Sequence, residues 1–261
     1  MLRSLYTAAT GMEAQQTQMD VIANNLANAS TTGFKKERAE FSDLLSDTIH
    51  GSGAPDPRGG AAPAALQVGL GVRTDATTRT FTQGDLQTTG NSTDIAIQGD
   101  GLFRVQQGSG ELAYTRAGNL RLDASGRLVT QAGDLIDPAI TVPAGANNLT
   151  IKPDGTVTAQ VAGRQDVTEL GTLSLFTFPN YGALQSAGGN LFKETQASGN
   201  AVQTKPGENS AGSLNQGFLE TANVKAVEEM INMITTQRAY EMNSKVIQSA
   251  DQMLQKLTSL R

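Results

Sequence analysis

The stretch SLYTAATGMEAQQTQMDVIANNLANASTTGF, residues 4–34, is the strongest indication of structure in the sequence. Its large apolar residues recur at a strict interval of seven: Leu5, Met12, Met19 and Leu26. A second row completes the pattern: Ala8, Ile22 and Ala29. Seven residues correspond to two helical turns, so the spacing is typical of a coiled-coil seam rather than of an ordinary half-buried helix.

The other end of the chain has the same pattern. Its apolar row is Met233, Tyr240, Ile247 and Leu254. Further apolar residues broaden that row: Val246, Met253, Leu260, Ile234, Ala250 and Leu257. Asn223 is predicted to be the N-cap of a helix that reaches Leu260. Because both ends carry a seam, the two terminal helices are predicted to pack as a coiled coil. A helix pair inside an ordinary globular protein stays open as the alternative.

The surface of the first helix points to association between copies. Residues 4–34 contain two charged side chains, Glu13 and Asp20, whereas a solvated helix is normally rich in Lys and Glu. The same stretch has six side-chain amides: Gln15, Gln16, Gln18, Asn24, Asn25 and Asn28. Amides suit a helix that is surrounded by other copies, where they hydrogen-bond across interfaces. The predicted self-assembly interface is Leu5, Met12, Met19, Ile22, Asn24, Asn25, Leu26, Asn28, Met233, Tyr240, Ile247 and Leu254.

The middle of the chain is predicted to be all-β. Residues 51–217 hold 26 of the 28 Gly and all eight Pro. Apolar clusters at 102–105, 112–115, 120–122 and 173–178 predict strands, with hairpin turns at Asp123–Gly126 and Pro153–Gly155. Residues 51–65 contain four Gly, three Pro and five Ala, and read as an extended connector.

These observations together predict an α+β fold with an all-β domain inserted between N- and C-terminal helices. The expected domains are a helical core of residues 1–34 plus 222–261 and a connector region of residues 35–91 plus 206–221. Residues 92–205 form the expected outer β domain.

The sequence contains few residues that would support catalysis or cofactor binding. The chain has one histidine, His50, and no cysteine, so neither a His-rich metal site nor thiol chemistry is available. The Gly99–Gly101 and Gly69–Gly71 sequences lack the third glycine of a dinucleotide loop, which favours turns. Glu228 and Glu229 could serve acid/base chemistry, yet their place early in a helix favours a dipole role. We therefore predict no catalytic, cofactor-binding or metal-binding residues.

Charge and hydropathy exclude two kinds of partner. The net charge is −5, and the basic residues Lys35, Lys36 and Arg38 are interpreted as a charge cluster at the end of a helix. Nucleic acid is not expected as a partner, because phosphate binding needs clustered Lys and Arg. No apolar run reaches the roughly 18 residues that would span a membrane, and the N-terminus lacks the apolar segment of a cleaved secretory signal.

Several stretches resemble the bacterial flagellar rod and hook proteins. They are residues 4–12, 14–16, 21–35, 66–72 and 94–103, with the C-terminal run over residues 223–257. Residues 21–35 read VIANNLANASTTGFK, which is similar to the N-terminal signature of that family. The opening residues, the C-terminal run and the chain length of 261 residues resemble the distal-rod type in particular.

The resemblance implies a structural subunit that polymerises into a rigid hollow drive shaft between motor and hook. It implies as partners further copies of the chain, the proximal rod proteins, the hook protein, the outer-ring bushing and the flagellar export apparatus. It also implies a rod that crosses the periplasm after type III export. The alternatives are a proximal rod or hook subunit, a β-rich cell-wall enzyme, and a type III secreted adhesin or effector.

Overall fold

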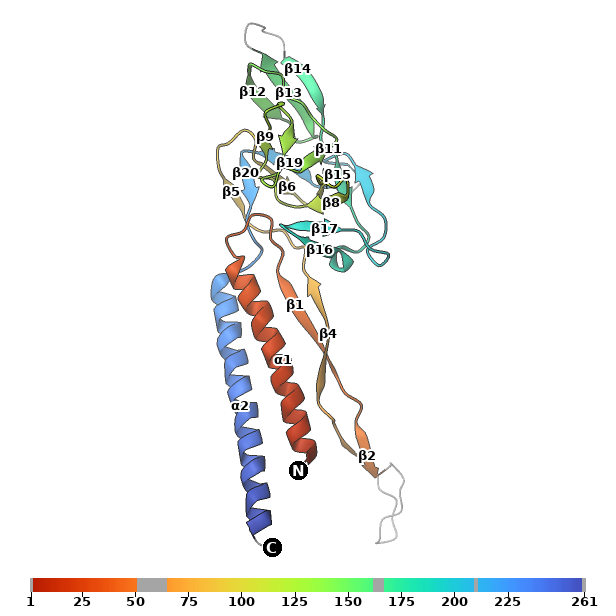
Figure 1. Ribbon diagram of the computed structural model, residues 1–261. Helices are drawn as coiled ribbons and strands as arrows, with labels where there is room; N and C mark the ends of the chain where they lie inside the picture. Colours follow the sequence, from red (N-terminus) through yellow and green to blue (C-terminus); the bar gives the residue numbers. More distant parts are fainter. Residues whose placement is uncertain (1, 51–64, 162–166, 209–210, 260–261) are drawn as a thin grey trace. The chain divides into compact units, whose positions relative to one another are not determined.

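The computed structural model describes residues 2–50, 65–161, 167–208 and 211–259 (Figure 1). The Gly/Pro/Ala-rich connector predicted at residues 51–65 lies almost wholly outside these residues. The chain on both sides of it forms paired strands, so the flanks of the connector region are extended. β1 (Glu37–Asp43) pairs with β4 (Val72–Arg79), and β2 (Asp47–His50) pairs with β3 (Leu66–Val68).

Contacts within the chain divide it into two compact units, which we call unit 1 and unit 2. Unit 1 comprises residues 1–26, 37–78 and 226–261, and unit 2 comprises residues 27–36 and 79–225. The chain therefore passes between the units four times, after residues 26, 36, 78 and 225. The domain boundaries expected from the sequence remain predictions.

Unit 1 contains both terminal helices and the two-stranded ribbon of β1 and β4. Helix α1 covers Leu2–Ala27 and α2 covers Ala226–Ser259, with 26 and 34 residues. The two helices run side by side in Figure 1, and a Cβ placed on Gly11 of α1 would lie 2.9 Å from Nδ2 of Asn243 of α2. Helices at both termini and a β-rich centre confirm the predicted α+β class.

Helix α1 ends earlier than the predicted stretch to residue 34. Asn28, Ser30 and Thr31 favour turns over helix because their side chains compete for backbone hydrogen bonds. The amide of Thr31 donates to the carbonyl of Asn28 at 3.0 Å. Gly33 then has φ +70°, and a Cβ there would lie 2.7 Å from the backbone nitrogen of Ala117. The glycine of the signature stretch is therefore needed for a close backbone approach.

Unit 2 is built almost entirely of antiparallel strands. Its seven-stranded sheet has the order β16-β17-β8-β7-β11-β10-β9, and a three-stranded sheet has the order β12-β13-β14. Three further pairs are β15-β18, β19-β6 and β20-β5. The bounds are β5 (Leu86–Thr88), β6 (Ile95–Gln98), β7 (Phe103–Gln106), β8 (Leu112–Thr115), β9 (Arg121–Leu122), β10 (Leu128–Val129), β11 (Leu135–Asp137), β12 (Ala146–Ile151), β13 (Thr156–Val161), β14 (Val167–Thr172), β15 (Leu175–Thr177), η1 (Tyr181–Ala183), β16 (Gln185–Gly188), β17 (Leu191–Lys193), β18 (Val202–Thr204), β19 (Ser213–Gln216) and β20 (Phe218–Glu220).

The strands predicted in the middle of the chain are confirmed at β7, β8, β9 and β15. Both predicted hairpin turns are also present. The amide of Gly126 donates to the carbonyl of Asp123 at 2.8 Å, and that of Gly155 donates to the carbonyl of Lys152 at 2.9 Å. The two glycines have φ +74° and +86°, the left-handed backbone that these turns require.

The main core of unit 2 is apolar and fully buried. Strand β6 supplies Ile95 and Ile97, and its partner β19 supplies Leu214, which pairs directly with Ile97. A second, aromatic cluster contains Tyr114, Phe176, Phe178 and Phe192. The rings of Tyr114 and Phe178 meet edge to face with centroids 4.8 Å apart. The core therefore draws on residues from 95 to 214, so chain segments far apart in sequence must meet to complete it.

Candidate functional site

The predicted interface residues of α1 are distributed over a partly covered helix. Ile22 and Asn25 are buried, whereas Asn24 is exposed. The others are half-buried: Leu5, Met12, Met19, Leu26 and Asn28. Gly11 allows close approach to Asn243 of α2, because any larger residue would require that side chain to shift.

Burial along α2 follows a seven-residue repeat. Glu229, Thr236 and Ala250 are buried, and Asn243 between them is half-buried. The predicted residues Met233, Ile247 and Leu254 are half-buried, and Tyr240 is 37% exposed. The covered side of α2 thus carries small and polar side chains in one row and apolar ones in the other.

The opposite side of α2 is apolar and exposed. Ile231 and Ile234 lie across the helix from Glu229 and Thr236, since each residue turns an α-helix by about 100°. Their exposed fractions are 56% and 57%, and Val227 is 71% exposed. Further exposed apolar side chains on this helix are Met230, Met242, Val246 and Met253. We call these seven residues the exposed apolar surface of α2. They do not form a single row, because Val246 and Met253 each lie about 60° from the covered side. A soluble monomer rarely leaves so many large apolar side chains uncovered.

Asn25 has a defined contact inside unit 1. Its Nδ2 donates to the carbonyl of Glu37 at 2.8 Å, and its Oδ1 accepts from the amide of Glu37 at 2.9 Å. Asn24 Nδ2 donates to the side-chain carboxylate of Glu37 at 3.3 Å. The side-chain amide of Asn25 thus fixes the first residue of β1 against the last turns of α1.

The sequence did not reveal a buried ion cluster in unit 2, formed by Lys35, Glu220 and Arg116. The side chains are 1%, 1% and 5% exposed. Lys35 Nζ donates to Glu220 Oε1 at 2.7 Å, and Arg116 Nε donates to Glu220 Oε2 at 2.5 Å. The interpretation of Lys35 as part of a charge cluster at the end of a helix is therefore wrong, because α1 ends at Ala27 and the charge of Lys35 is enclosed and paired.

Backbone groups satisfy the rest of the cluster. Arg116 donates to the carbonyls of Gly101, Ile97 and Gly99 at 2.5, 3.0 and 2.6 Å, so the turn containing two glycines receives a guanidinium rather than a cofactor. Lys35 Nζ also donates to the carbonyl of Thr82 at 2.7 Å. Buried charges are tolerated when they are paired and fully hydrogen-bonded in this way.

Burial and pairing act in opposite directions on the acid–base properties of the cluster. Burial lowers the pKa of Lys35, although Glu220 opposes that shift. Burial alone would raise the pKa of Glu220, but Arg116, Lys35 and the amide of Gly84 together lower it. The carboxylate is therefore the charged centre that holds both cations.

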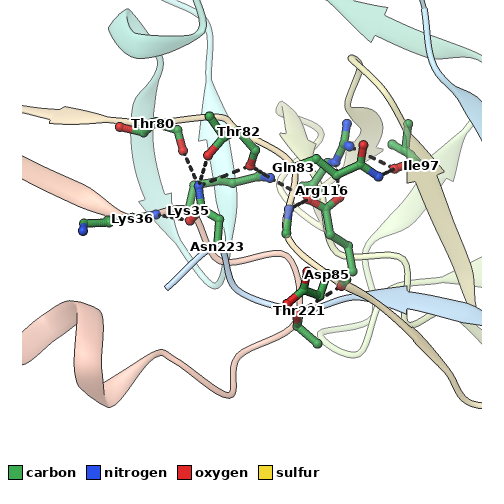
Figure 2. Close-up of polar contacts among 12 residues, drawn as sticks. Lys35, Lys36, Thr80, Thr82, Gln83, Asp85, Ile97, Arg116, Thr221 and Asn223 are labelled. Atoms are coloured by element: carbon green, nitrogen blue, oxygen red, sulfur yellow. Dashed lines mark hydrogen bonds and ion pairs between the residues drawn. The ribbon is translucent and has the colours of Figure 1, made fainter. Parts of the chain in front are cut away.

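Asn223 lies close to this cluster, and Figure 2 shows it with Lys36, Thr80 and Thr82. Its Oδ1 accepts from the amide of Lys36 at 2.7 Å, and its Nδ2 donates to the carbonyls of Thr80 and Thr82 at 2.8 and 3.2 Å. The prediction that Asn223 caps the C-terminal helix is wrong, because α2 begins at Ala226 and the side chain is engaged elsewhere.

No signal in the sequence distinguished these residues. Lys35 stands beside Lys36 in a basic run, and the partner carboxylate lies 185 positions further along the chain. Local spacing cannot report a contact of that range. Asn223 resembled a cap because it precedes a helical pattern.

The described residues offer no metal centre. Within residues 2–50, 65–161, 167–208 and 211–259, no three His, Asp or Glu side chains are placed to hold an ion. His50, the one histidine of the sequence, is the last residue of β2. A hollow of about 500 Å³ in unit 2 is lined largely by hydroxyl and amide side chains, among them Thr32, Asn119, Thr130 and Asn190. In the part of the chain that the structure describes, no helix is long and apolar enough to cross a membrane.

Comparison with known families defines the class of protein. Residues 5–35 match the family described as flagella basal body rod protein. Residues 96–159 match the D1 domain of the flagellar hook proteins FlgE/F/G, and residues 215–260 match the C-terminal part of the FlgEFG basal body rod proteins. The class is that of the rod and hook proteins of the flagellum.

Full-length relatives narrow this class. The flagellar basal-body rod protein FlgG of Buchnera aphidicola from Acyrthosiphon pisum is 48% identical over 260 residues, covering 100% of both chains. The proteins of the same name from Caulobacter vibrioides and Bacillus subtilis are 46% and 40% identical, again over 100% of each chain. The flagellar hook protein FlgE of Helicobacter mustelae is 43% identical over 52% of this chain and 30% of its own length. The chain belongs to the flagellar basal-body rod protein family, and it is a structural subunit of the flagellar rod.

Proposed function

We propose that copies of this chain assemble through their terminal helices into a rigid hollow tube, the distal rod, which transmits torque from motor to hook. The observation that carries the proposal is the exposed apolar surface of α2. Seven large apolar side chains on it are at least 48% exposed in the single chain. Burying such side chains stabilises an assembly by about 25 cal/mol for each Å² removed from water.

We propose further that α1 and α2 pack as a coiled coil within each subunit, with their outer surfaces against neighbouring copies. The seven-residue repeat of burial on α2 supports this arrangement. The contact between Gly11 and Asn243 supports a close approach of the two backbones. The predicted interface residues that are half-buried in the single chain, such as Met19 and Met233, would become fully covered in the tube.

The proposed setting follows the family. The subunit would be exported without cleavage of a signal and would join a rod that crosses the periplasm. Its proposed neighbours are proximal rod proteins at one end, the hook protein at the other and outer-ring proteins around it. Neither membrane insertion nor nucleic-acid binding is part of the proposal. The family is a structural one, and we propose that the chain acts without catalysis; a turnover assay on peptidoglycan checks this.

Electron microscopy and sedimentation velocity of the purified protein test self-assembly. The wild-type chain is expected to form straight tubes. Ile231→Gln and Ile234→Gln are expected to stay monomeric, because glutamine keeps a high helix propensity while removing the apolar contact. Leu112→Gln is the matched control, since Leu112 is 47% exposed in unit 2. Tubes from both α2 variants would contradict the proposal.

A further inference from the structure

Several chain segments leave unit 2 close to Asn223. Three of the four passages between the units begin in residues 33–36, 79–85 and 217–225. All three of these segments belong to unit 2 and meet around Asn223. Every covalent connection between the two units runs through these segments or through the fourth passage, after residue 26.

The single residue Asn223 makes hydrogen bonds that connect all three segments. Its backbone amide donates to the carbonyl of Phe34 at 3.4 Å, and its Oδ1 accepts from the amide of Lys36 at 2.7 Å. Its Nδ2 reaches the carbonyl of Thr80, together with the carbonyl and hydroxyl of Thr82, the latter at 2.9 Å. A side-chain amide supplies both groups that this position uses, an oxygen acceptor for one segment and two N–H donors for another.

The ion cluster ties the same segments a second time. Lys35 of the first segment donates to Thr82 of the second and to Glu220 of the third. Glu220 also accepts from the amide of Gly84 at 2.9 Å, and its own carbonyl accepts from the amide of Gly33 at 2.9 Å. Arg116 then links Glu220 to the carbonyls of residues 97–101 and so to the apolar core of unit 2.

We infer that Asn223 and the Lys35–Glu220–Arg116 cluster form a clamp that carries torque between the rod core and the body of each subunit. A single extended segment turns freely about its φ and ψ angles, whereas three segments fastened to one another cannot rotate independently. The inference rests on the proposed rod function. Asn223 is a positioning residue in this scheme, because it fixes backbone segments rather than contacting a partner.

Asn223→Asp and Asn223→Ala test the clamp. Aspartate keeps the acceptor for Lys36 but sets a carboxylate oxygen against two carbonyls, so it is expected to act more strongly than alanine. In the full-length monomer, hydrogen exchange of peptides covering 33–36 and 79–85 should accelerate by about tenfold or more. Exchange of the peptide covering β6 should not change. Thr82→Val, which removes one hydroxyl contact, should give a smaller acceleration and serves where either Asn223 variant folds poorly.

Swimming speed under viscous load distinguishes a clamp that carries torque from a residue that only stabilises unit 2. Cells with Asn223→Ala or Thr82→Val rods should assemble basal bodies and swim in thin medium, yet lose speed more steeply than wild type as viscosity rises. Glu111→Gln, at an exposed ion pair with Lys193 in unit 2, is the control and should follow wild type. Wild-type dependence on viscosity in every Asn223 and Thr82 variant would overturn the clamp while leaving the rod function intact. Failure of the wild-type protein to form tubes would instead overturn the proposed function.

Discussion

The interior of unit 2 and the length of α2 distribute their side chains in opposite ways. In unit 2, Phe103 and Leu173 are 0% exposed, and the buried Lys35 and Arg116 are both paired with Glu220. On α2, Thr236 faces the covered side while Val227 is 71% exposed and Met242 is 61% exposed. Unit 2 thus completes its core within one chain, whereas α2 leaves large apolar side chains exposed, and we propose that further copies cover them.

The largest expected effect concerns where the self-sufficient part of the chain ends. The sequence places the β domain at residues 92–205, whereas contacts extend unit 2 to residue 225. A fragment of residues 27–225, which contains all of unit 2, should unfold cooperatively in urea. A fragment of 92–205 lacks β19, so it loses the buried Leu214 and uncovers Ile97, and should be less stable by more than about 5 kcal/mol. Equal unfolding midpoints would show that the body does not need its C-terminal strands.

Glu220→Gln in the full-length protein is expected to cost about 3–5 kcal/mol, because two buried cations lose their shared carboxylate. Thermal unfolding followed by near-ultraviolet circular dichroism reports mainly unit 2, because Tyr114 there is 3% exposed whereas Tyr6 and Tyr240 of the helices are 58% and 37% exposed. The unfolding of α1 and α2 should change much less, and circular dichroism at 222 nm follows these helices separately. The exposed pair of Arg127 and Asp123 provides the control, and Asp123→Asn should cost less than about 1 kcal/mol. A Glu220→Gln protein as stable as wild type would mean that the cluster is replaceable.

Leu26→Ala and Ile247→Ala test the terminal helices rather than unit 2. Both residues are half-buried in the single chain, so the monomer should lose little. In the tube each change should cost about 2–5 kcal/mol per subunit, provided that neighbouring copies complete the burial. The critical concentration for assembly, measured by sedimentation, should therefore rise strongly in both variants and not in Val202→Ala, whose side chain is 52% exposed in unit 2. Unchanged critical concentrations would place the interface elsewhere on the helices.

The smallest expected effect is the acid sensitivity of the cluster. The pKa of Glu220 lies below its ordinary value of 4.5 in the folded chain, so the folded state binds fewer protons than the unfolded state. The stabilisation is present above pH 4.5 and is lost as the pH falls through the lowered pKa. Thermal unfolding between pH 7 and pH 3 should show this loss in wild type. The Glu220→Gln variant should show a shallower dependence, and parallel curves would contradict the assignment.

The sequence predicted the elements that depend on local pattern. The seven-residue repeats located both helices, and Gly126 and Gly155 marked turns because their positive φ angles follow from local chemistry. The end of α1 was placed too late, since the turn-forming residues Asn28–Gly33 also lie within a stretch free of proline.

The clamp could not be predicted, because its parts come from opposite ends of the chain. Lys35 and Glu220 are 185 residues apart, and each resembles an ordinary surface charge in its own neighbourhood. The role of Asn223 likewise depends on Thr80 and Thr82, more than 140 residues earlier. Burial and charge pairing at such range arise only when the whole of unit 2 has closed.

The bond between Asn223 and Thr80 has a consequence for how such a subunit can change during evolution. It makes the entrance and the exit of the β-rich body neighbours, joined at 2.8 Å. A body whose two ends touch can be enlarged, trimmed or exchanged as a cassette without displacing the helices to which it is attached. The hook protein of Helicobacter mustelae is a longer relative, of which this chain covers 30%. Such a difference in length is expected if the proteins share the attachment at Asn223 and differ in the inserted body.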